Sequence, residues 1–126
     1  MTEGGWAAFL IAAGIGAPAR YLLDGWVQDR TSGALPWGTF LVNVTGCLAL
    51  GLLTGLGLHH GLSAGTRTVL GTGGIGAYTT FSTLTFETVR LAEEGAINDA
   101  VRNAAASLLV GLAAASVGLA LTAALW

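Results

Sequence analysis

The sequence predicts an all-α membrane protein with four transmembrane helices, the third of which is interrupted mid-membrane. Hydrophobic residues make up 53% of the 126 residues and charged residues only 10%, with a mean hydropathy of +0.70. Soluble domains carry about 25% charged residues, so this chain has too few to cover a water-facing surface. Because the connections between its apolar stretches are short, we expect one membrane domain over residues 1–126.

The first two predicted spans cover residues 6–23 and 37–58. A crossing of a hydrocarbon core of about 30 Å needs about 20 mostly apolar residues, which both stretches meet or approach. The first contains Arg20 near its end, and Pro18 should kink the helix or end it there. The second follows Pro36, a residue compatible with a helix start.

The third and fourth predicted spans cover residues 68–91 and 96–126, and the fourth has no charge after Arg102. Tryptophan rings favour the headgroup level of a bilayer, and all four tryptophans fall near predicted span ends. They are Trp6, Trp26, Trp37 and Trp126.

The third span is apolar at its ends but easily broken in its middle. Four glycines lie between Gly71 and Gly76, and each costs roughly 1 kcal/mol of helix propensity relative to Ala. Five of the seven residues from Thr79 to Thr85 are Ser or Thr. Irregular backbone at membrane depth is tolerated only where it is buried in protein or lines a water-filled cavity. We therefore expect the functional centre here.

Asn43 lies near the centre of the second span and shares a helical face with Thr39 and Gly46. A buried amide in lipid needs hydrogen-bonding partners, so Asn43 either joins two helices or faces a pore as a donor. The residues alone leave both interpretations open.

Further polar or aromatic side chains recur at helical spacing in the third and fourth spans. Asn103, Ser107 and Gly111 form a stripe that helix packing could also explain. Phe81 and Leu84 share a face of the third span, and an aromatic ring edge carries partial positive charge that could face an anion. Small residues spaced for close helix packing include Gly51 and Gly55.

Several classes of function are disfavoured by what the chain contains. A net charge of −2 does not favour nucleic-acid binding. A single cysteine, Cys47, leaves no disulfide framework, and both histidines lie in one loop with no nucleophile–base pair. We therefore predict that the protein is not an enzyme. The letters Gly71-x-Gly73-x-x-Gly76 match a dinucleotide-binding pattern, but that motif needs a strand before it.

A polar but uncharged path suits passive movement of a small ion, and its amide, hydroxyl and ring-edge donors favour an anion. Backbone carbonyls exposed by a broken helix can coordinate Na⁺, so the break at Gly76 to Thr79 could hold a cation. Four spans enclose little volume, so we expect homo-oligomerisation. The arginines favour one side of the membrane only weakly, which also suits a chain that inserts in both orientations.

Three segments in order resemble the Fluc (CrcB-type) fluoride channels. They are Gly14-Ile-Gly-Ala-Pro-Ala-Arg20-Tyr21, Gly38-Thr-Phe-Leu-Val-Asn43-Val-Thr-Gly46-Cys47 and Gly73-Gly-Ile-Gly76-Ala-Tyr-Thr79-Thr-Phe81-Ser82-Thr83. The resemblance implies an antiparallel, dual-topology homodimer in the plasma (inner) membrane with two pores that export toxic fluoride. It also implies a structural, non-transported Na⁺ at the dimer centre, bound by the backbone carbonyls of Gly76 and Thr79.

The resemblance implies pore-lining roles for Asn43, Phe81, Ser82 and Thr83, and a vestibule position for Arg20. We add Thr39, Leu84, Asn103 and Ser107, which share the polar and aromatic faces, to the candidate pore residues. Two of these depart from the family: Leu84 stands where a second Phe is common, and Asn103 stands where a Tyr is common.

Two rival functions remain. A small multidrug-resistance-type proton-coupled exporter also has four short spans, but its chemistry needs a carboxylate embedded in the first span. This chain offers only Glu3, at the edge of that span. A non-transporting assembly subunit is the other rival, and it gives no reason for an interrupted third span.

Overall fold

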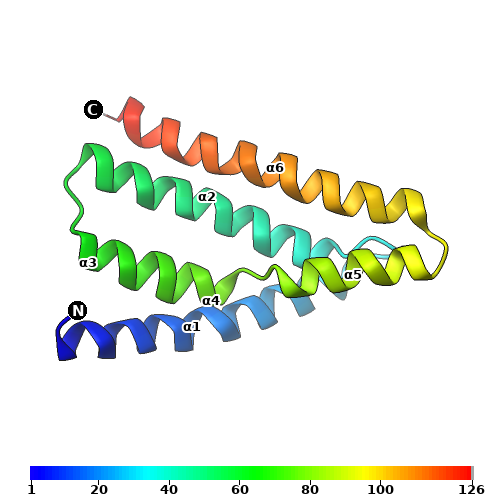
Figure 1. Ribbon diagram of the computed structural model, residues 1–126, viewed down its shortest axis with the longest axis horizontal. Helices are drawn as coiled ribbons and strands as arrows, with labels where there is room; N and C mark the ends of the chain where they lie inside the picture. The colour runs from blue at the N-terminus through cyan, green and yellow to red at the C-terminus, as the bar shows by residue number, and fades with distance from the viewer. Residues whose placement is uncertain (126) are drawn as a thin grey trace.

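The computed structural model describes residues 1–125, which form helices joined by short connections, with no strand among them (Figure 1). Trp126, the last residue of the predicted fourth span, lies outside the described residues. The all-α prediction is confirmed for the described chain. The helices are α1 (Glu3–Gln28), α2 (Trp37–His59), α3 (Ala64–Arg67), the π-helical η1 (Thr68–Ile75), α4 (Gly76–Tyr78), α5 (Ser82–Glu93) and α6 (Ile97–Ala124).

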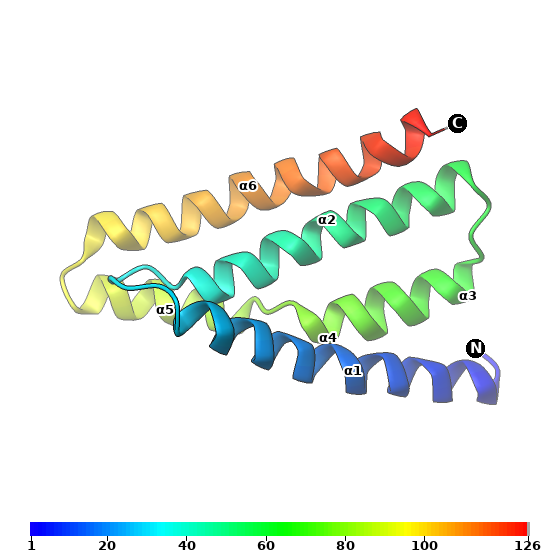
Figure 2. The same ribbon diagram turned by 180° about the vertical axis from the view of Figure 1, so that it is seen from behind.

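The helices run back and forth along one long axis (Figures 1 and 2). The first helix, α1, leads away from the amino terminus and α2 returns. The series α3, η1, α4 and α5 then leads away again, and α6 returns to the end where the chain started. Contacts connect α2 with α6, α1 with η1 and α4, and α5 with α6. Both ends of the chain therefore lie at the same end of the bundle.

Three helices, α1, α2 and α6, are long and apolar enough to cross a membrane. They contain the predicted spans at residues 6–23 and 37–58 and nearly all of the described part of residues 96–126. The first helix extends five residues beyond its predicted end, to Gln28, so Pro18 does not end it. Arg20 accordingly lies within a continuous helix, two turns before its end, so of the two expectations for Pro18, a kink or a helix end, the helix end is wrong.

The third helical segment is broken after Tyr78. Thr79 is extended (φ −79°, ψ 164°), and helix resumes at Ser82 (Figure 1). The glycines from Gly71 to Gly76 remain helical, with a π-type bond from the Gly76 N–H to the Gly71 carbonyl. The chain leaves the helix at Thr79, at the end of the stretch from Gly76 to Thr79 where the sequence placed the break.

The glycines serve close packing against α1 instead. A Cβ on Gly73 would lie 3.0 Å from the Phe9 carbonyl oxygen, and a Cβ on Gly16 would overlap the Gly74 carbonyl. Close approach of helix backbones through small residues is the common means of helix association in lipid. The glycines thus hold η1 and α4 against α1.

A second seam of small residues joins α2 to α6. A Cβ on Gly51 would overlap the Ala115 backbone, a Cβ on Gly55 the Thr122 side chain, and a Cβ on Gly118 the Leu48 backbone. The expected packing role of Gly51 and Gly55 is confirmed. This seam fixes the position of α2, which carries Asn43, relative to α6, which carries Ser107.

Gly51→Ala should lower the free energy of unfolding by about 1–3 kcal/mol, because overpacking of this kind outweighs the helix propensity gained. Gly25→Ala is the matched control: Gly25 is also helical, but a Cβ there would meet nothing within 4 Å. We expect the control to be neutral or slightly stabilised. Thermal melting of the purified proteins in detergent would compare them, and equal melting temperatures would contradict the packing role of Gly51.

Candidate ion-conducting site at the helix break

The break is held open by a pair of hydrogen bonds between Asn43 and the Thr80 peptide group. Asn43 Nδ2 donates to the Thr80 carbonyl oxygen at 2.7 Å, and the Thr80 N–H donates to Asn43 Oδ1 at 2.8 Å. In a continuous helix the Thr80 N–H would instead donate to the Gly76 carbonyl. The Asn43 side chain thus supplies the hydrogen bonds that the N–H and C=O groups of Thr80 would otherwise make within a helix.

Thr80 also begins the next helix. Its hydroxyl accepts the Thr83 N–H at 3.2 Å, donates to Thr83 Oγ1 at 3.1 Å, and lies 3.3 Å from Ser82 Oγ. A Thr hydroxyl that accepts an N–H three residues later satisfies one of the free donors at a helix start. Thr80 was not among the candidate residues, although its spacing from Thr83 is the signal that could have identified it.

The carbonyl groups of Gly76 and Thr79 are among those at the break that lose their helical donors. The N–H of Thr80 goes to Asn43, and the N–H of Thr83 goes to the Thr80 hydroxyl. Among the described residues no hydrogen bond reaches the Gly76 oxygen, and Thr79 O accepts only Arg20 Nη1, at 3.1 Å. Neutral oxygens freed from a helix are suitable ligands for a hard cation. The expected Na⁺ ligands, Gly76 and Thr79, therefore have the right chemistry for that role.

A long groove of about 780 Å³ runs beside the break and is open to the outside of the chain. Its walls come from α2, the segments η1 to α5, and α6. Most of its lining is apolar, including Leu84 and the ring of Phe81, which is 77% exposed. The polar members are Asn43, Thr79, Thr80, Thr85, Thr88 and Ser107.

Ser107 is the one described residue of this groove with a buried and unpartnered side-chain oxygen. Buried hydroxyls usually find a hydrogen-bond partner, and each exception needs an explanation. Ser107 lies on the groove wall, but its hydroxyl oxygen is covered by neighbouring atoms, so a ligand in the groove reaches it only if the side chain moves.

The remaining candidate residues lie outside the groove lining. Thr39 is 2% exposed and donates to Glu87 Oε1 at 3.2 Å. Asn103 is 5% exposed and donates to the Thr88 hydroxyl at 2.9 Å. Ser82 and Thr83 are engaged with Thr80. The groove thus brings together Asn43, Gly76, Thr79, Phe81, Leu84 and Ser107, whereas Thr39, Asn103, Ser82 and Thr83 lie behind or beside its wall.

Arg20 reaches the break rather than an end of the bundle, since its guanidinium bonds to Thr79. The vestibule role inferred from the resemblance stays a prediction.

Glu87 was not among the candidates either; its Oε2 is buried without a partner, and Thr39 bonds to the other oxygen.

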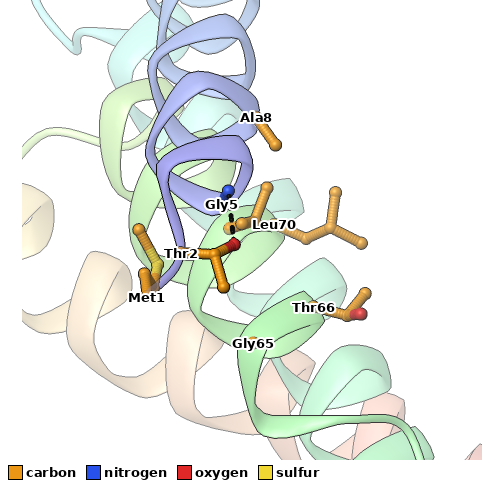
Figure 3. A pocket seen from close by; sticks show the side chains of 8 residues that line it. Met1, Thr2, Gly5, Ala8, Gly65, Thr66 and Leu70 are labelled. Carbon is orange, nitrogen blue, oxygen red and sulfur yellow. Dashed lines mark hydrogen bonds between the residues drawn. The ribbon is translucent and has the colours of Figure 1, made fainter.

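A second hollow, of about 510 Å³, lies between the start of α1 and α3 (Figure 3). Its lining is mostly apolar, and its two hydroxyl groups are engaged locally. Thr2 Oγ1 accepts the Gly5 N–H at 3.2 Å, and Thr66 Oγ1 lies 2.8 Å from Ser63 Oγ. The described residues that line this hollow include no Asp, Glu, Lys, Arg or His side chain.

Comparison with known proteins identifies the family. The model of the family described as CrcB-like protein, Camphor Resistance (CrcB), matches residues 7–119. This chain belongs to the CrcB family. The resemblance inferred from the three sequence segments is thereby confirmed.

Similar curated proteins cover almost the whole of this CrcB-family chain. "Fluoride-specific ion channel FluC 1" of Streptomyces avermitilis is 49% identical over 96% of this chain and 98% of its own length. A protein of the same name from Leifsonia xyli is 46% identical over 89% of this chain and 82% of its own. "Fluoride-specific ion channel FluC" of Acidobacterium capsulatum is 44% identical over 90% of both chains. These relatives are named as channels, in agreement with the prediction that the chain is not an enzyme.

Asn43→Ala should destabilise the fold by about 1–3 kcal/mol, because it leaves the N–H and C=O groups of Thr80 without partners. Thr54→Ala is the matched control, since the Thr54 hydroxyl bonds only to the Leu50 carbonyl of its own helix. Melting temperature and hydrogen exchange at the Thr80 amide would be measured. Unchanged protection of that amide would contradict the role given to Asn43.

Proposed function

We propose that this protein is a fluoride-specific channel that lets fluoride leave the cell passively across the plasma membrane and so lowers its toxicity. Close relatives that match over almost their full length carry the name of fluoride-specific ion channels. The observation that carries the proposal is the groove beside the break, which offers donors but no carboxylate among its described lining residues.

The third crossing of the membrane is made by two half-helices. The continuous helix from Ala64 to Tyr78 is about 22 Å long and α5 is about 18 Å long, at about 1.5 Å per residue. Together they are long enough for a hydrocarbon core of about 30 Å. With α1, α2 and α6 they make four crossings, which agrees with both chain ends lying at one end of the bundle.

A second copy of the chain closes the groove. One chain leaves the Phe81 ring 77% exposed and the groove open along α6. Many large apolar side chains on the same chain are exposed as well, as expected for a surface that meets lipid or a partner. An antiparallel homodimer would line each of two pores with residues of both copies. Such a dimer needs the chain to insert in both orientations across the membrane, which suits a chain whose arginines favour one orientation only weakly.

Fluoride would be stripped of water gradually by donors along the groove. Asn43 uses one Nδ2 hydrogen on Thr80 and keeps the other, and Ser107 has no internal partner. The edge of the Phe81 ring adds partial positive charge without a fixed ion. Weak neutral donors of this kind let an ion enter and leave, as conduction requires. Leu84 would shape this path from the groove wall, and four polar residues outside the lining would extend it: Thr39, Ser82, Thr83 and Asn103.

The Gly76 and Thr79 carbonyls would hold a structural Na⁺ at the dimer centre, because they are neutral oxygens without helical donors. When bound, Na⁺ supplies the positive charge that such freed carbonyls otherwise lack. Asn43 and Thr80 keep those oxygens out of helical hydrogen bonding, and Arg20 orients one of them. The ion would stay in place and would not be transported.

A small multidrug-resistance-type exporter is not supported by these features. Proton coupling in the membrane relies on an embedded ionisable group that faces the transport path. The described lining of the groove contains no Asp, Glu or His.

Fluoride efflux from liposomes that contain the purified protein tests the main proposal. We expect rapid passive efflux in a fluoride-electrode recording and little chloride flux under the same gradient. Empty liposomes are the control, and efflux no faster than theirs would contradict the channel function.

Phe81→Ile should slow fluoride efflux by at least about tenfold, since it removes the ring edge from the groove while the apolar volume is roughly kept. Phe86→Ile is the matched control: this ring lies on α5, which begins directly after Phe81, and is 67% exposed, but it does not line the groove. Equal rates in the two variants would remove Phe81 from the proposed path.

A further inference from the structure

Arg20 contacts the same carbonyl oxygen that is assigned to the proposed cation. Its Nη1 donates to Thr79 O at 3.1 Å, and it reaches this oxygen from α1 across 59 positions of sequence. The Thr79 carbonyl is free for this bond because the Thr83 N–H bonds to the Thr80 hydroxyl. A carbonyl oxygen has two lone pairs, so it can accept from Arg20 and bind a cation as well.

No carboxylate of the described chain forms an ion pair with Arg20. A guanidinium remains protonated at all ordinary pH values. The ion pairs among the described residues join Arg90 to Glu94 and Arg102 to Asp99. Asp24, one turn further along α1, instead accepts from Gln28 Nε2 at 2.8 Å and lies against Gly38.

The ligand atoms at the break add no negative charge either. The freed oxygens of Gly76 and Thr79 are neutral carbonyls, and the described residues contain no group of three or more His, Cys, Asp or Glu side chains that could hold a metal ion. Divalent cations are usually bound by sites that include carboxylates. A site that has only neutral oxygens and lies beside a fixed positive charge therefore strongly disfavours divalent cations.

We propose that Arg20 is a specificity-determining residue of the cation site, whose fixed charge beside the Thr79 carbonyl weakens cation binding and restricts the site to singly charged ions. This inference rests on the proposed Na⁺ site. Coulomb repulsion is proportional to the charge of the bound ion, so Ca²⁺ meets twice the repulsion that Na⁺ meets. In a symmetric homodimer each copy contributes one Arg20, which doubles the effect for both ions.

The test uses the full-length protein in detergent, with N-methylglucamine chloride replacing NaCl or CaCl₂ at constant ionic strength. Melting temperature and the dimer fraction on size exclusion are measured against the concentration of each cation, since a ligand that binds only the folded state raises its stability. The variants are Arg20→Gln, which removes the charge and keeps an N–H donor, and Arg20→Lys, which keeps the charge. Arg20→Met is a second neutral variant in case the Gln variant does not fold.

We expect Na⁺ to stabilise the unmodified protein and Arg20→Lys, and Ca²⁺ to stabilise neither. In the neutral variants the Na⁺ concentration for half-maximal stabilisation should fall about tenfold, and Ca²⁺ should become stabilising. If Na⁺ stabilises the unmodified protein but the neutral variants show the same Na⁺ midpoint and no response to Ca²⁺, only the role of Arg20 is overturned. If Na⁺ has no effect on the unmodified protein, the cation site itself is overturned, and the role of Arg20 with it.

Discussion

The reciprocal hydrogen bonds between Asn43 and the Thr80 peptide group are the interaction on which the site depends. They satisfy the Thr80 donor and acceptor away from the helix, so the break carries no orphaned group at Thr80. The same bonds release the Gly76 carbonyl, and the start of α5 at Ser82 follows from the freed Thr80 hydroxyl. Asn43 on α2 and the Thr80 hydroxyl together determine where the third segment stops, where it resumes, and which oxygens it exposes.

The break also marks a change of packing partner. Before it, η1 and α4 lie against α1 through Gly16 and Gly73; after it, α5 lies against α6. The seam between α2 and α6 then holds Asn43 opposite the break. The half-helix before the break is therefore held by α1 and the half-helix after it by α6. Residues 79–81 lie between these two contacts, which position them from both sides.

Composition and apolar length were sufficient to predict the helical class, the three long helices and the region of the break, because burial in lipid leaves few alternatives for such a chain. The break was expected at Gly76 to Thr79, and the chain leaves the helix at Thr79. Helix propensity also marked Gly71 to Gly76 as a weak point, yet α1 packs against these glycines and they stay helical. The inward reach of Arg20 and the capping role of Thr80 depend on which helices become neighbours, and the linear sequence does not state that.

The π-helical stretch from Thr68 to Ile75 determines the direction in which the residues after it point around the helix axis. A π-turn contains an additional residue compared with an α-turn, so η1 advances the chain with a different rotation from an ordinary helix. Deleting one residue there would turn the subsequent backbone by about 100° relative to α1. Thr80 would then face away from Asn43, so insertions and deletions in η1 should be far less tolerated than substitutions that keep its length.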